Sequence, residues 1–500
     1  MKIKELHVIF ILIVTIAACK TEEHAIVDYR PKIHFTPQAH WMNDPNGMVF
    51  YKGTYHLFYQ YYPDSTVWGP MHWGHASTKD LIHWEHLPIA LYPDSLGYIF
   101  SGSAVADLKN TSGFGKNGIV PLVAIYTNHD PKGEKEKSTT YQNQSLAYSL
   151  DEGKKWIKFA GNPVLKSPDI TDFRDPKVMW YERGHTWIMT LATKDRITFY
   201  SSTNLKTWTK QSEFGEKIGG HGGVWECPDL FPLTKGGKTY WVLLVSINPG
   251  APNGGSGTQY FVGDFDGKVF KPLTTKTRWI DYGTDNYAGV TWSNTGNRRI
   301  FLGWMSNWLY ANQVPTKEWR GATTVPREFS LANNSQEIIL VTQPIKELDK
   351  IDCESESKEN IKITALQEVF SGKNVPFKVE LQAAKLESFV LYLRNKLGEQ
   401  ILIGYDKKSN QYFMDRTKSG NTSFNPEFSK VHYAPRVSST DNLKLKLIVD
   451  VTSVELFADD GMTAMTDILF PNAKMDRISI SSGKGLNLSK MKFTELQVIR

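Results

Sequence analysis

Alternating apolar and polar positions dominate the first two thirds of the chain. From about residue 50 to 330 this two-residue period is frequent, as over 54–59, 240–245 and 299–304, whereas helical periodicity is scarce. Such alternation is typical of strands that bury one face. The pattern therefore predicts an all-β architecture for this part of the chain.

A local motif recurs within this region. The segment Ser77–Trp84 resembles Ser202–Trp208, with a looser copy at Ser149–Trp156 and a still looser one at Gly263–Phe270. Each copy predicts a polar turn between two strands, with an aromatic residue opening the second strand. Units of several short strands that recur along a chain indicate a β-propeller, although an assortment of ordinary hairpins is the alternative. Roughly 300 residues at four strands per blade would form about five blades.

The pattern changes after Pro344. A Lys- and Glu-rich stretch over 346–360 has no strong period and is typical of a domain boundary. Alternation returns at 443–451, where every second residue is Leu or Val. Several short strands joined by turns predict a β-sandwich over 353–500, following a propeller over 31–345.

The first residues have the pattern of an export signal. Two lysines precede an apolar run over 8–18 that is too short to span a bilayer and that ends at Cys19. Segment 1–19 resembles a bacterial lipoprotein signal whose cysteine is lipidated; a plain signal peptide is the alternative. Residues 20–30 then read as a tether. We expect an exported bacterial lipoprotein, anchored to a membrane at the periplasmic face or the cell surface.

Composition excludes several classes of protein. The 40% hydrophobic and 22% charged residues fit a soluble globular chain and exclude a disordered or polytopic membrane protein. The net charge of +6 is small for 500 residues and no dense basic stripe is present, so nucleic acid is not an expected partner. Three cysteines and no metal-binding motif around the histidines predict no metal site. The 12% aromatic content fits a sugar-binding surface or a Trp-rich β core.

Three short motifs place a carboxylate beside an aromatic residue or an arginine. They are Trp41–Gly47 with Asp44, Phe173–Pro176 with Asp175, and Trp225–Asp229 with Glu226. By itself each motif could be a turn or a surface ion pair. Together they begin what would be successive blades, whose innermost strands converge on one central channel. Two carboxylates about 5 Å apart can perform retaining glycoside hydrolysis, provided that burial or a neighbouring charge keeps one of them protonated.

At these motifs the chain resembles glycoside hydrolase family 32, the fructan hydrolases and invertases. The matching segments run in order through the first predicted domain: 41–47, 58–63, 68–75, 100–103, 173–176 and 226–229, then Tyr287-Ala288 and 304–308. The run 449–461 is similar to the C-terminal sandwich of that family. The resemblance implies a five-bladed β-propeller followed by a β-sandwich. It also implies retaining hydrolysis of β-linked fructosyl units without a cofactor.

The resemblance further implies a role for each site residue. Asp44 would attack the anomeric carbon, Glu226 would act as acid and then as base, and Asp175 would stabilise the transition state through the sugar hydroxyls. The implied substrate-binding residues are Trp41, Asn43, Gln60, Trp68, Phe100, Ser101, Arg174, Cys227, Tyr287 and Trp308. Cys227 would tune the neighbouring acid and would not serve as a nucleophile.

The substrate is predicted from the expected location of the protein in the cell. An exported, anchored enzyme has more use for fructans (levan or inulin) and fructo-oligosaccharides than for a cytoplasmic sugar, so an exo-acting fructan β-fructosidase is expected. The alternatives are an invertase, an endo-levanase with an open cleft, a fructosyltransferase, an inverting five-bladed arabinan or xylan hydrolase, and a catalytically inactive glycan-binding lipoprotein. Oligomeric state and linkage preference are left open.

Overall fold

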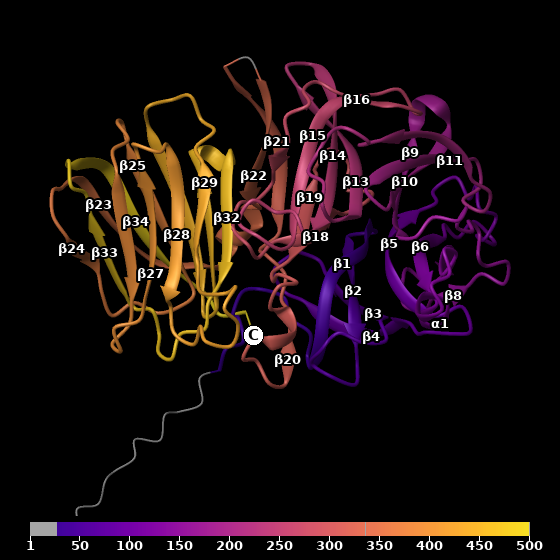
Figure 1. Cartoon of the computed structure of the whole chain (residues 1–500), viewed down its shortest axis with the longest axis horizontal. Coiled ribbons are helices and arrows are strands. Elements are labelled where there is room, and N and C mark those ends of the chain that lie inside the picture. The colour runs from indigo at the N-terminus through magenta and orange to yellow at the C-terminus, as the bar shows by residue number, and fades with distance from the viewer. Residues whose placement is uncertain (1–27, 336, 500) are drawn as a thin grey trace, which may run out of the picture.

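A computed structural model describes residues 28–335 and 337–499 of the chain. In this part of the chain, five sheets surround a channel and two six-stranded sheets form a second layered body beside them (Figure 1). The predicted lipoprotein signal, with Cys19, and residues 20–27 of the predicted tether lie outside the described residues. None of the described helices is long and apolar enough to cross a membrane.

The five sheets are the blades of a β-propeller, as the fold prediction requires. Their innermost strands contact one another in a closed ring and are β1 (His40–Tyr51), β5 (Tyr98–Ala106), β9 (Phe173–Tyr181), β13 (Val224–Lys235) and β18 (Tyr287–Thr291). The remaining blade strands are β2 (Thr54–Tyr62), β3 (His72–Thr78), β4 (Glu85–Leu91), β6 (Leu122–His129), β7 (Gln142–Ser149), β8 (Ile157–Lys158), β10 (Thr186–Thr193), β11 (Arg196–Ser202), β12 (Thr209–Phe214), β14 (Lys238–Asn248), β15 (Gly257–Phe265), β16 (Phe270–Pro272), β17 (Arg278–Trp279), β19 (Ile300–Trp304), β21 (Arg327–Asn334) and β22 (Glu337–Pro344). A late segment, β20 (Trp319–Arg320), pairs in parallel with β1 and so joins the end of the propeller to its start.

The recurring sequence motif is the turn between the third and fourth strands of a blade. The copies at 77–84, 149–156 and 202–208 link β3 to β4, β7 to β8 and β11 to β12. In each turn an Asp or Asn side chain accepts backbone N–H bonds, and the next or second-next residue has a positive φ, as at Leu81 and Leu205. These side-chain bonds replace the ladder where the chain reverses. The predicted polar turns are therefore confirmed, each followed by an aromatic residue at the start of the next strand.

The second body is the predicted β-sandwich. One sheet has the order β23 (Asp352–Ile363), β34 (Leu486–Leu496), β25 (Phe377–Ala383), β30 (Leu443–Asp450), β31 (Ser453–Ala458), β32 (Thr463–Ile468). The other has the order β24 (Gln367–Phe370), β33 (Arg477–Ser481), β26 (Phe389–Arg394), β27 (Gln400–Asp406), β28 (Gln411–Lys418), β29 (Val431–Pro435). Their facing apolar side chains form one buried core.

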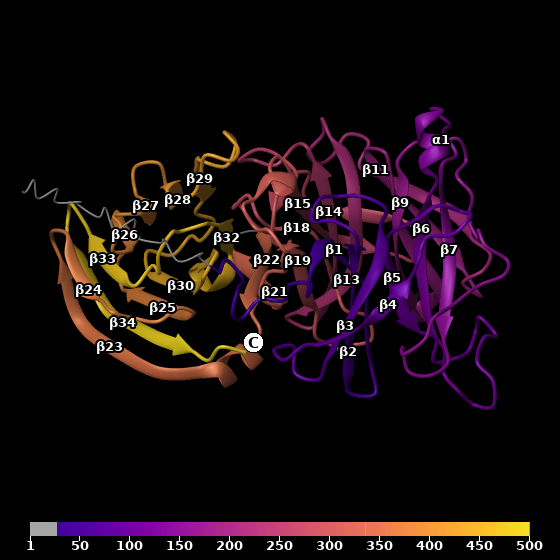
Figure 2. The ribbon, with the colours of Figure 1, turned by 90° about the horizontal axis from the view of Figure 1, so that it is seen from below.

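The Lys- and Glu-rich stretch that indicated a boundary contains regular structure. It begins with the 3₁₀ helix η3 (Lys346–Ile351) and continues as β23, which curves along the edge of the sandwich (Figure 2). Most side chains of β23 are exposed because it is an edge strand that pairs only with β34. An edge strand that is exposed to solvent on both faces has no alternation of apolar and polar residues, which explains why the sequence pattern did not reveal it. The other described helices are α1 (Pro131–Lys135), η1 (Glu182–Gly184), η2 (Ala311–Gln313) and η4 (Asp459–Gly461).

Buried charges join the two bodies. Arg327 of β21 donates to Asp281 of the propeller at 2.8 Å and, through Nε, to Glu455 of the sandwich at 3.2 Å. The His34 imidazole lies between Asp450 and Glu455, with both N···O distances at 2.8 Å. All of these side chains are at most 1% exposed. Because a buried charge is costly without its partner, the two bodies stabilise each other.

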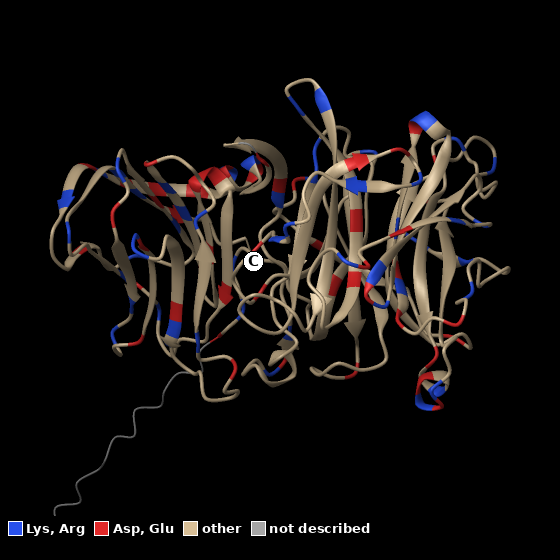
Figure 3. Ribbon diagram, turned by 45° about the horizontal axis from the view of Figure 1, so that its top comes forward, with Lys and Arg blue, Asp and Glu red and all other residues tan. Residues whose placement is uncertain are grey.

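The segment that leads into the propeller also contacts the sandwich. The backbone N–H of Lys32 donates to the Asp450 carboxylate at 2.9 Å, and the Thr452 hydroxyl donates to the Tyr29 carbonyl at 3.1 Å. Arg30 lies over the ring of Trp319, 4.8 Å from its centroid. Residues 29–32 are therefore attached to the body of the protein. Elsewhere, acidic and basic residues are interspersed along both bodies (Figure 3).

Candidate active site

Each innermost strand is interrupted where its motif lies. The pairing register shifts at Met42–Pro45 in β1, at Ile99–Gly102 in β5, opposite Thr190–Ala192 in β9, at Glu226–Asp229 in β13 and at Tyr287–Val290 in β18. Three residues in these bulges have positive φ: Asp175 (64°), Cys227 (44°) and Ala288 (53°). A bulge turns a side chain away from the regular alternation of the strand. The bulges thus direct polar side chains from neighbouring blades to one end of the channel.

The three predicted carboxylates meet in one pocket of about 220 Å³. Its lining residues are Asn43, Asp44, Gln60, Trp68, Phe100, Ser101, His129, Glu134, Tyr141, Gln142, Asp172, Arg174, Asp175, Glu226 and Trp308. Ten of the predicted site residues are among them. The other three, Trp41, Cys227 and Tyr287, are at most 4% exposed and lie behind the lining, where they contact its residues.

Asp44 is held by hydrogen-bond donors on both carboxylate oxygens. The Asn43 amide donates to Oδ1 at 2.8 Å and the Ser101 hydroxyl donates to Oδ2 at 2.8 Å. Trp41 Nε1 donates to Asn43 Oδ1 at 2.8 Å and so fixes which side of that amide faces Asp44. Burial raises the pKa of Asp44, the nearby Glu226 adds to the increase, and the bonds from Ser101 and Asn43 oppose it. These bonds favour the ionised form, which is the form that a nucleophile needs.

Glu226 has a different set of partners. The Arg174 guanidinium donates to Oε1 from Nε at 3.2 Å and from Nη2 at 3.0 Å, and the Tyr287 hydroxyl donates to Oε2. Asp172 orients the arginine, accepting from Nη1 at 2.5 Å. Burial and the charge of Glu226 raise the pKa of Tyr287 well above its usual value, so the phenol keeps its proton and remains a donor. The arrangement can stabilise Glu226 as a carboxylate after it has given up a proton.

Asp175 lines the same pocket as the other two carboxylates. Its Oδ2 accepts the backbone N–H of Cys227 at 3.0 Å, and its own backbone N–H donates to the Thr127 hydroxyl at 3.0 Å. Burial raises the pKa of Asp175 to about 7; Arg174 opposes the increase, and the charges of Glu226 and Asp44 add to it. Asp175 therefore keeps a proton to a higher pH than an exposed aspartate does.

The Cys227 side chain bridges two of these carboxylates. Its Sγ lies 3.4 Å from Asp44 Oδ2 and 3.6 Å from Asp175 Oδ2. Burial raises the pKa of the thiol well above its usual value, and the surrounding carboxylates add to the increase. The group therefore remains a protonated, weak donor between two acids, as expected for a residue that tunes the site and does not attack the substrate.

Aromatic side chains form the walls of the pocket. Phe100 stacks on His129 with centroids 4.2 Å apart, and Trp308 stacks on Trp41 at 5.9 Å. Trp68 is 39% exposed and lies at the rim. Gln60 is buried, and its amide nitrogen has no hydrogen-bond partner among the described residues. The pocket thus offers apolar faces and a free donor, which is the combination that a sugar ring with hydroxyl groups requires.

Sequence reasoning missed five lining residues: His129, Glu134, Tyr141, Gln142 and Asp172. Four of them come from the end of the hairpin between β6 and β7, including α1, where His129 Nε2 lies 3.1 Å from Glu134 Oε2. That hairpin carries no recognisable motif. Asp172 could have been found, because it directly precedes the motif Phe173–Pro176.

Comparisons with known proteins cover both bodies. Residues 34–344 match the glycosyl hydrolases family 32 N-terminal domain, and residues 343–500 match the family 32 C-terminal domain. A levanase from Bacillus subtilis (strain 168) is 50% identical over 475 residues, which cover 92% of this chain and 69% of the relative. The crystal structure of exo-inulinase from Aspergillus awamori has a TM-score of 0.86 at 37% identity, covering 94% of this chain and 99% of that one.

A second structure contains a bound sugar. It is the β-fructofuranosidase from Schwanniomyces occidentalis complexed with fructosyl-erythritol, with a TM-score of 0.85 at 35% identity, covering 93% of this chain and 97% of that one. These matches span the propeller and the sandwich and confirm the resemblance carried by the acidic motifs. The chain belongs to glycosyl hydrolase family 32.

Proposed function

We propose that the protein is a β-fructosidase that releases fructose from the ends of β-linked fructans and fructo-oligosaccharides with retention of configuration. The observation that carries this proposal is the meeting of Asp44, Asp175 and Glu226, from three separate blades, in one pocket of about 220 Å³. This volume is below the lower limit of about 300 Å³ for pockets that hold drug-sized ligands. It suits one terminal sugar unit better than an internal stretch of polymer. The levanase and exo-inulinase relatives support the substrate class.

In the first step Asp44 attacks the anomeric carbon while Glu226 protonates the leaving oxygen. Asn43 and Ser101 hold the Asp44 carboxylate in one orientation, so little motion is needed to reach the attacking geometry. When Glu226 has lost its proton, Arg174 and Tyr287 stabilise the resulting carboxylate. A covalent fructosyl-enzyme intermediate and a free sugar result.

In the second step Glu226 acts as a base. It removes a proton from water, which attacks the anomeric carbon and releases Asp44, so two inversions give net retention. Asp175 accepts hydrogen bonds from sugar hydroxyls on the ring that carries the developing positive charge. Because these bonds strengthen as charge develops, they lower the barrier and not merely the dissociation constant.

The product profile on levan, inulin and sucrose tests this proposal. A chain starting at residue 28 should release free fructose as the earliest product from a polymer, and NMR should show the retained β-anomer first. A ladder of oligosaccharides would mean endo cleavage, activity on sucrose alone would indicate an invertase, and an inverted anomer would exclude the double displacement. The Asp44→Ala variant should lose at least about 10³-fold in kcat, as expected when a nucleophile is removed.

We also infer that the protein is exported and anchored to a membrane through a lipid on Cys19. The apolar run over 8–18 and the position of the cysteine at its end support this inference. In a bacterial host the full chain should fractionate with membranes and incorporate an azide-bearing fatty acid. A Cys19→Ala variant should do neither, and equal labelling of the variant would contradict the inference.

A further inference from the structure

Neighbouring inner strands of the propeller belong to different sheets. Their relative positions therefore depend on side chains that cross from blade to blade, and not on continuous backbone ladders. Three of these strands bear neighbouring residues of the site: β9 bears Asp175, β13 bears Glu226, and β18 bears Tyr287, the hydrogen-bond partner of Glu226. A buried cluster joins these same three strands further along the channel.

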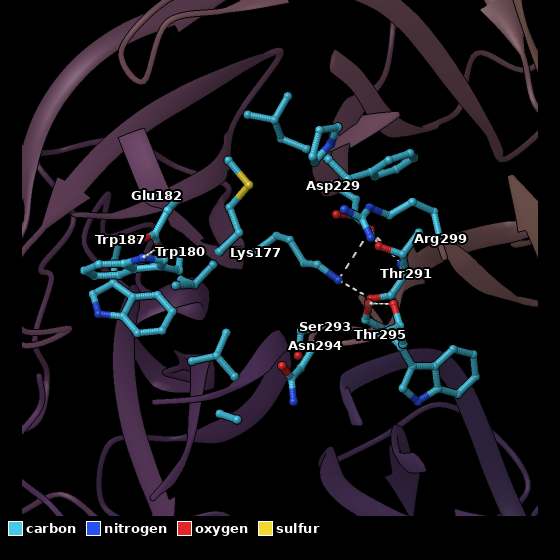
Figure 4. A pocket seen from close by; sticks show the side chains of 18 of the residues that line it. Lys177, Trp180, Glu182, Trp187, Asp229, Thr291, Ser293, Asn294, Thr295 and Arg299 are labelled. Atoms are coloured by element: carbon cyan, nitrogen blue, oxygen red, sulfur yellow. Dashed lines mark hydrogen bonds and ion pairs between the residues drawn. The ribbon is translucent and has the colours of Figure 1, made fainter. Parts of the chain in front are cut away.

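The cluster consists of Lys177, Asp229 and Thr291, one residue from each strand (Figure 4). Lys177 Nζ lies 3.3 Å from Asp229 Oδ2 and donates to the Thr291 carbonyl oxygen. The same Oδ2 accepts the Thr291 backbone N–H at 2.6 Å and its hydroxyl at 2.7 Å. The three residues are 8%, 1% and 3% exposed. Each strand is thus bonded to both of the others; we call this cluster the three-strand clamp.

The clamp follows directly after the bulges of the active site. Lys177 lies two residues beyond Asp175, Asp229 three residues beyond Glu226, and Thr291 four residues beyond Tyr287. The clamp residues line a second pocket, of about 400 Å³, and none of them lines the active-site pocket. A bulge is a local interruption of the ladder, and pairing within each blade resumes at or just before the clamp residues. The clamp therefore fixes the three strands relative to one another close to the point where each bulge ends.

Stability alone does not account for a buried ion pair at this position. Replacing such a pair by apolar residues of similar volume is often neutral or stabilising, whereas removing one partner is costly. The bonds of the clamp are directional, however, and they fix the distances between three backbones. Apolar packing would hold the same strands together with less control of their register.

We propose that Lys177 and Asp229, together with Thr291, are positioning residues that set the separation of Asp175, Glu226 and Tyr287. The proposal rests on the catalytic roles proposed above. A shift of about 1 Å in a reacting group can lower a rate by about 10²-fold. Loosening the clamp should therefore lower kcat more than it changes KM, although no clamp residue lines the active-site pocket.

The test is a double-mutant cycle with Asp229→Asn, Lys177→Met and the combined variant. Each single variant leaves one buried group without its partner and should lose both thermal stability and kcat, by about 10–100-fold in kcat. The combined variant removes both charges of the pair and leaves Arg299 as the remaining charged group that faces Asp229, so its Tm should recover in part relative to the single variants. Its kcat should stay low, and the limbs of its kcat–pH profile should shift, because the carboxylates alter each other's proton affinity according to their spacing.

A second readout separates positioning from general damage. Fructosyl fluoride has a leaving group that needs little protonation, so a variant in which Glu226 is displaced should lose less activity on it than on a fructan. The matched control is the exposed pair Lys109 and Glu182, 3.2 Å apart beside the same second pocket. Lys109→Met should retain the wild-type kcat and pH profile on both substrates.

A combined variant with wild-type kcat and pH profile would overturn the proposal and leave the pair a purely structural one. If the single variants do not fold, Thr291→Val, which keeps both charges and loses one hydroxyl bond, should still lower kcat with KM nearly constant; an unchanged kcat would also overturn it. Failure of the proposed function would look different, since it would appear in the products of the wild-type protein on levan, inulin and sucrose, or as an Asp44→Ala variant that remains active.

Discussion

Asp175 is a buried acid that shares its pocket with two other acids, and this placement opposes folding at neutral pH. Its pKa in the folded protein, about 7, lies above the ordinary value of 3.8 because burial disfavours the charge. The folded state therefore binds a proton more tightly than the unfolded state between these two values. By linkage, the contribution of this group to stability falls as the pH rises from about 4 to about 7.

An Asp175→Asn variant should accordingly be more stable than the wild type at pH 8, although nearly inactive. The amide oxygen can still accept the Cys227 N–H, and no charge has to be buried. A gain of about 1 kcal/mol would raise Tm by about 1–2 °C in a protein of this size, and the gain should vanish at pH 4, where the wild-type acid is protonated. Thermal melting at the two pH values measures it; a lower Tm at pH 8 would show that the charge is better compensated than we infer.

At this scale the sequence predicted well which residues meet in the pocket, and predicted the residues around them less well. The carboxylates and the walls formed by Trp68, Phe100 and Trp308 lie in motifs that resemble those of a known family, and all of them line the pocket. His129 and Glu134 were missed because their place depends on how one hairpin folds over the channel. A pattern along the chain contains no such information.

The strands that carry the site residues contain β-bulges, and at some bulge positions there is no room for a larger side chain. Gly102 lies in the bulge of β5, next to Ser101, and a Cβ at this position would lie 2.1 Å from the backbone oxygen of Ile125. Backbone atoms of β6 cannot move aside without shifting the whole hairpin. The bulge therefore depends on this glycine.

A Gly102→Ala variant should lose stability and activity together. Relief of the clash would push β5 away from β6 and move Ser101 from Asp44, so we expect a loss of about 1–3 kcal/mol, as for overpacked sites, and a fall in kcat. Urea unfolding and steady-state kinetics measure both. The matched control is Gly483→Ala, since a Cβ there meets no atom within 4 Å; if the two variants behave alike, the close approach at Gly102 is not limiting.

The repeated turns were predictable because each copy uses the same local chemistry, in which an Asp or Asn accepts backbone N–H bonds at a reversal. Strand β23 was not predictable, because it lies at the edge of its sheet and exposes both of its faces to solvent. The bulges were also invisible in the pattern. Their sequence motifs resemble those of ordinary turns. Only the ring of blades shows that the bulges direct the three carboxylates to a common point.

At the scale of the whole molecule, the two bodies depend on each other for charge neutralisation. Arg327 belongs to the propeller, and Glu455, one of its two carboxylate partners, to the sandwich. Asp285 of the propeller likewise pairs with Arg416 of the sandwich at 2.6 Å. These partners are more than a hundred residues apart in sequence, so no local pattern could have predicted them.

A propeller fragment spanning 28–345 should therefore fail to fold as a soluble protein. Removal of the sandwich leaves Asp285 without Arg416 and leaves Arg327 with only one of its two carboxylate partners, Asp281. It also exposes the apolar surface that faces the sandwich. Breaking one buried pair costs about 3–5 kcal/mol, and two such losses approach the whole stability of a typical domain, about 5–15 kcal/mol. Soluble yield and circular dichroism of the fragment test this; a monomeric, active fragment would contradict it.

The His34 contact makes the junction sensitive to alkaline pH. Burial alone would lower the pKa of His34, but hydrogen bonds to Asp450 and Glu455 and their charges raise it to about 9. Because the folded-state value exceeds the unfolded value of 6.5, the stabilisation is complete below pH 6.5 and is lost as the pH rises through about 9. In a His34→Gln variant the urea midpoint should lie well below that of the wild type at pH 6. The two midpoints should converge above pH 9, and a constant difference would mean that His34 is neutral.

The outermost strands β4, β8, β12, β16 and β22 contribute no residue to the lining of the active-site pocket. Selection for catalysis consequently acts on the innermost strands and leaves the outermost strands free to drift, except β22, which also contacts the sandwich. This perimeter is thus the place where a lineage could change solubility, glycan adhesion or neighbours without retuning the reaction. It is equally where an engineer could attach a dye or a linker for immobilising the enzyme.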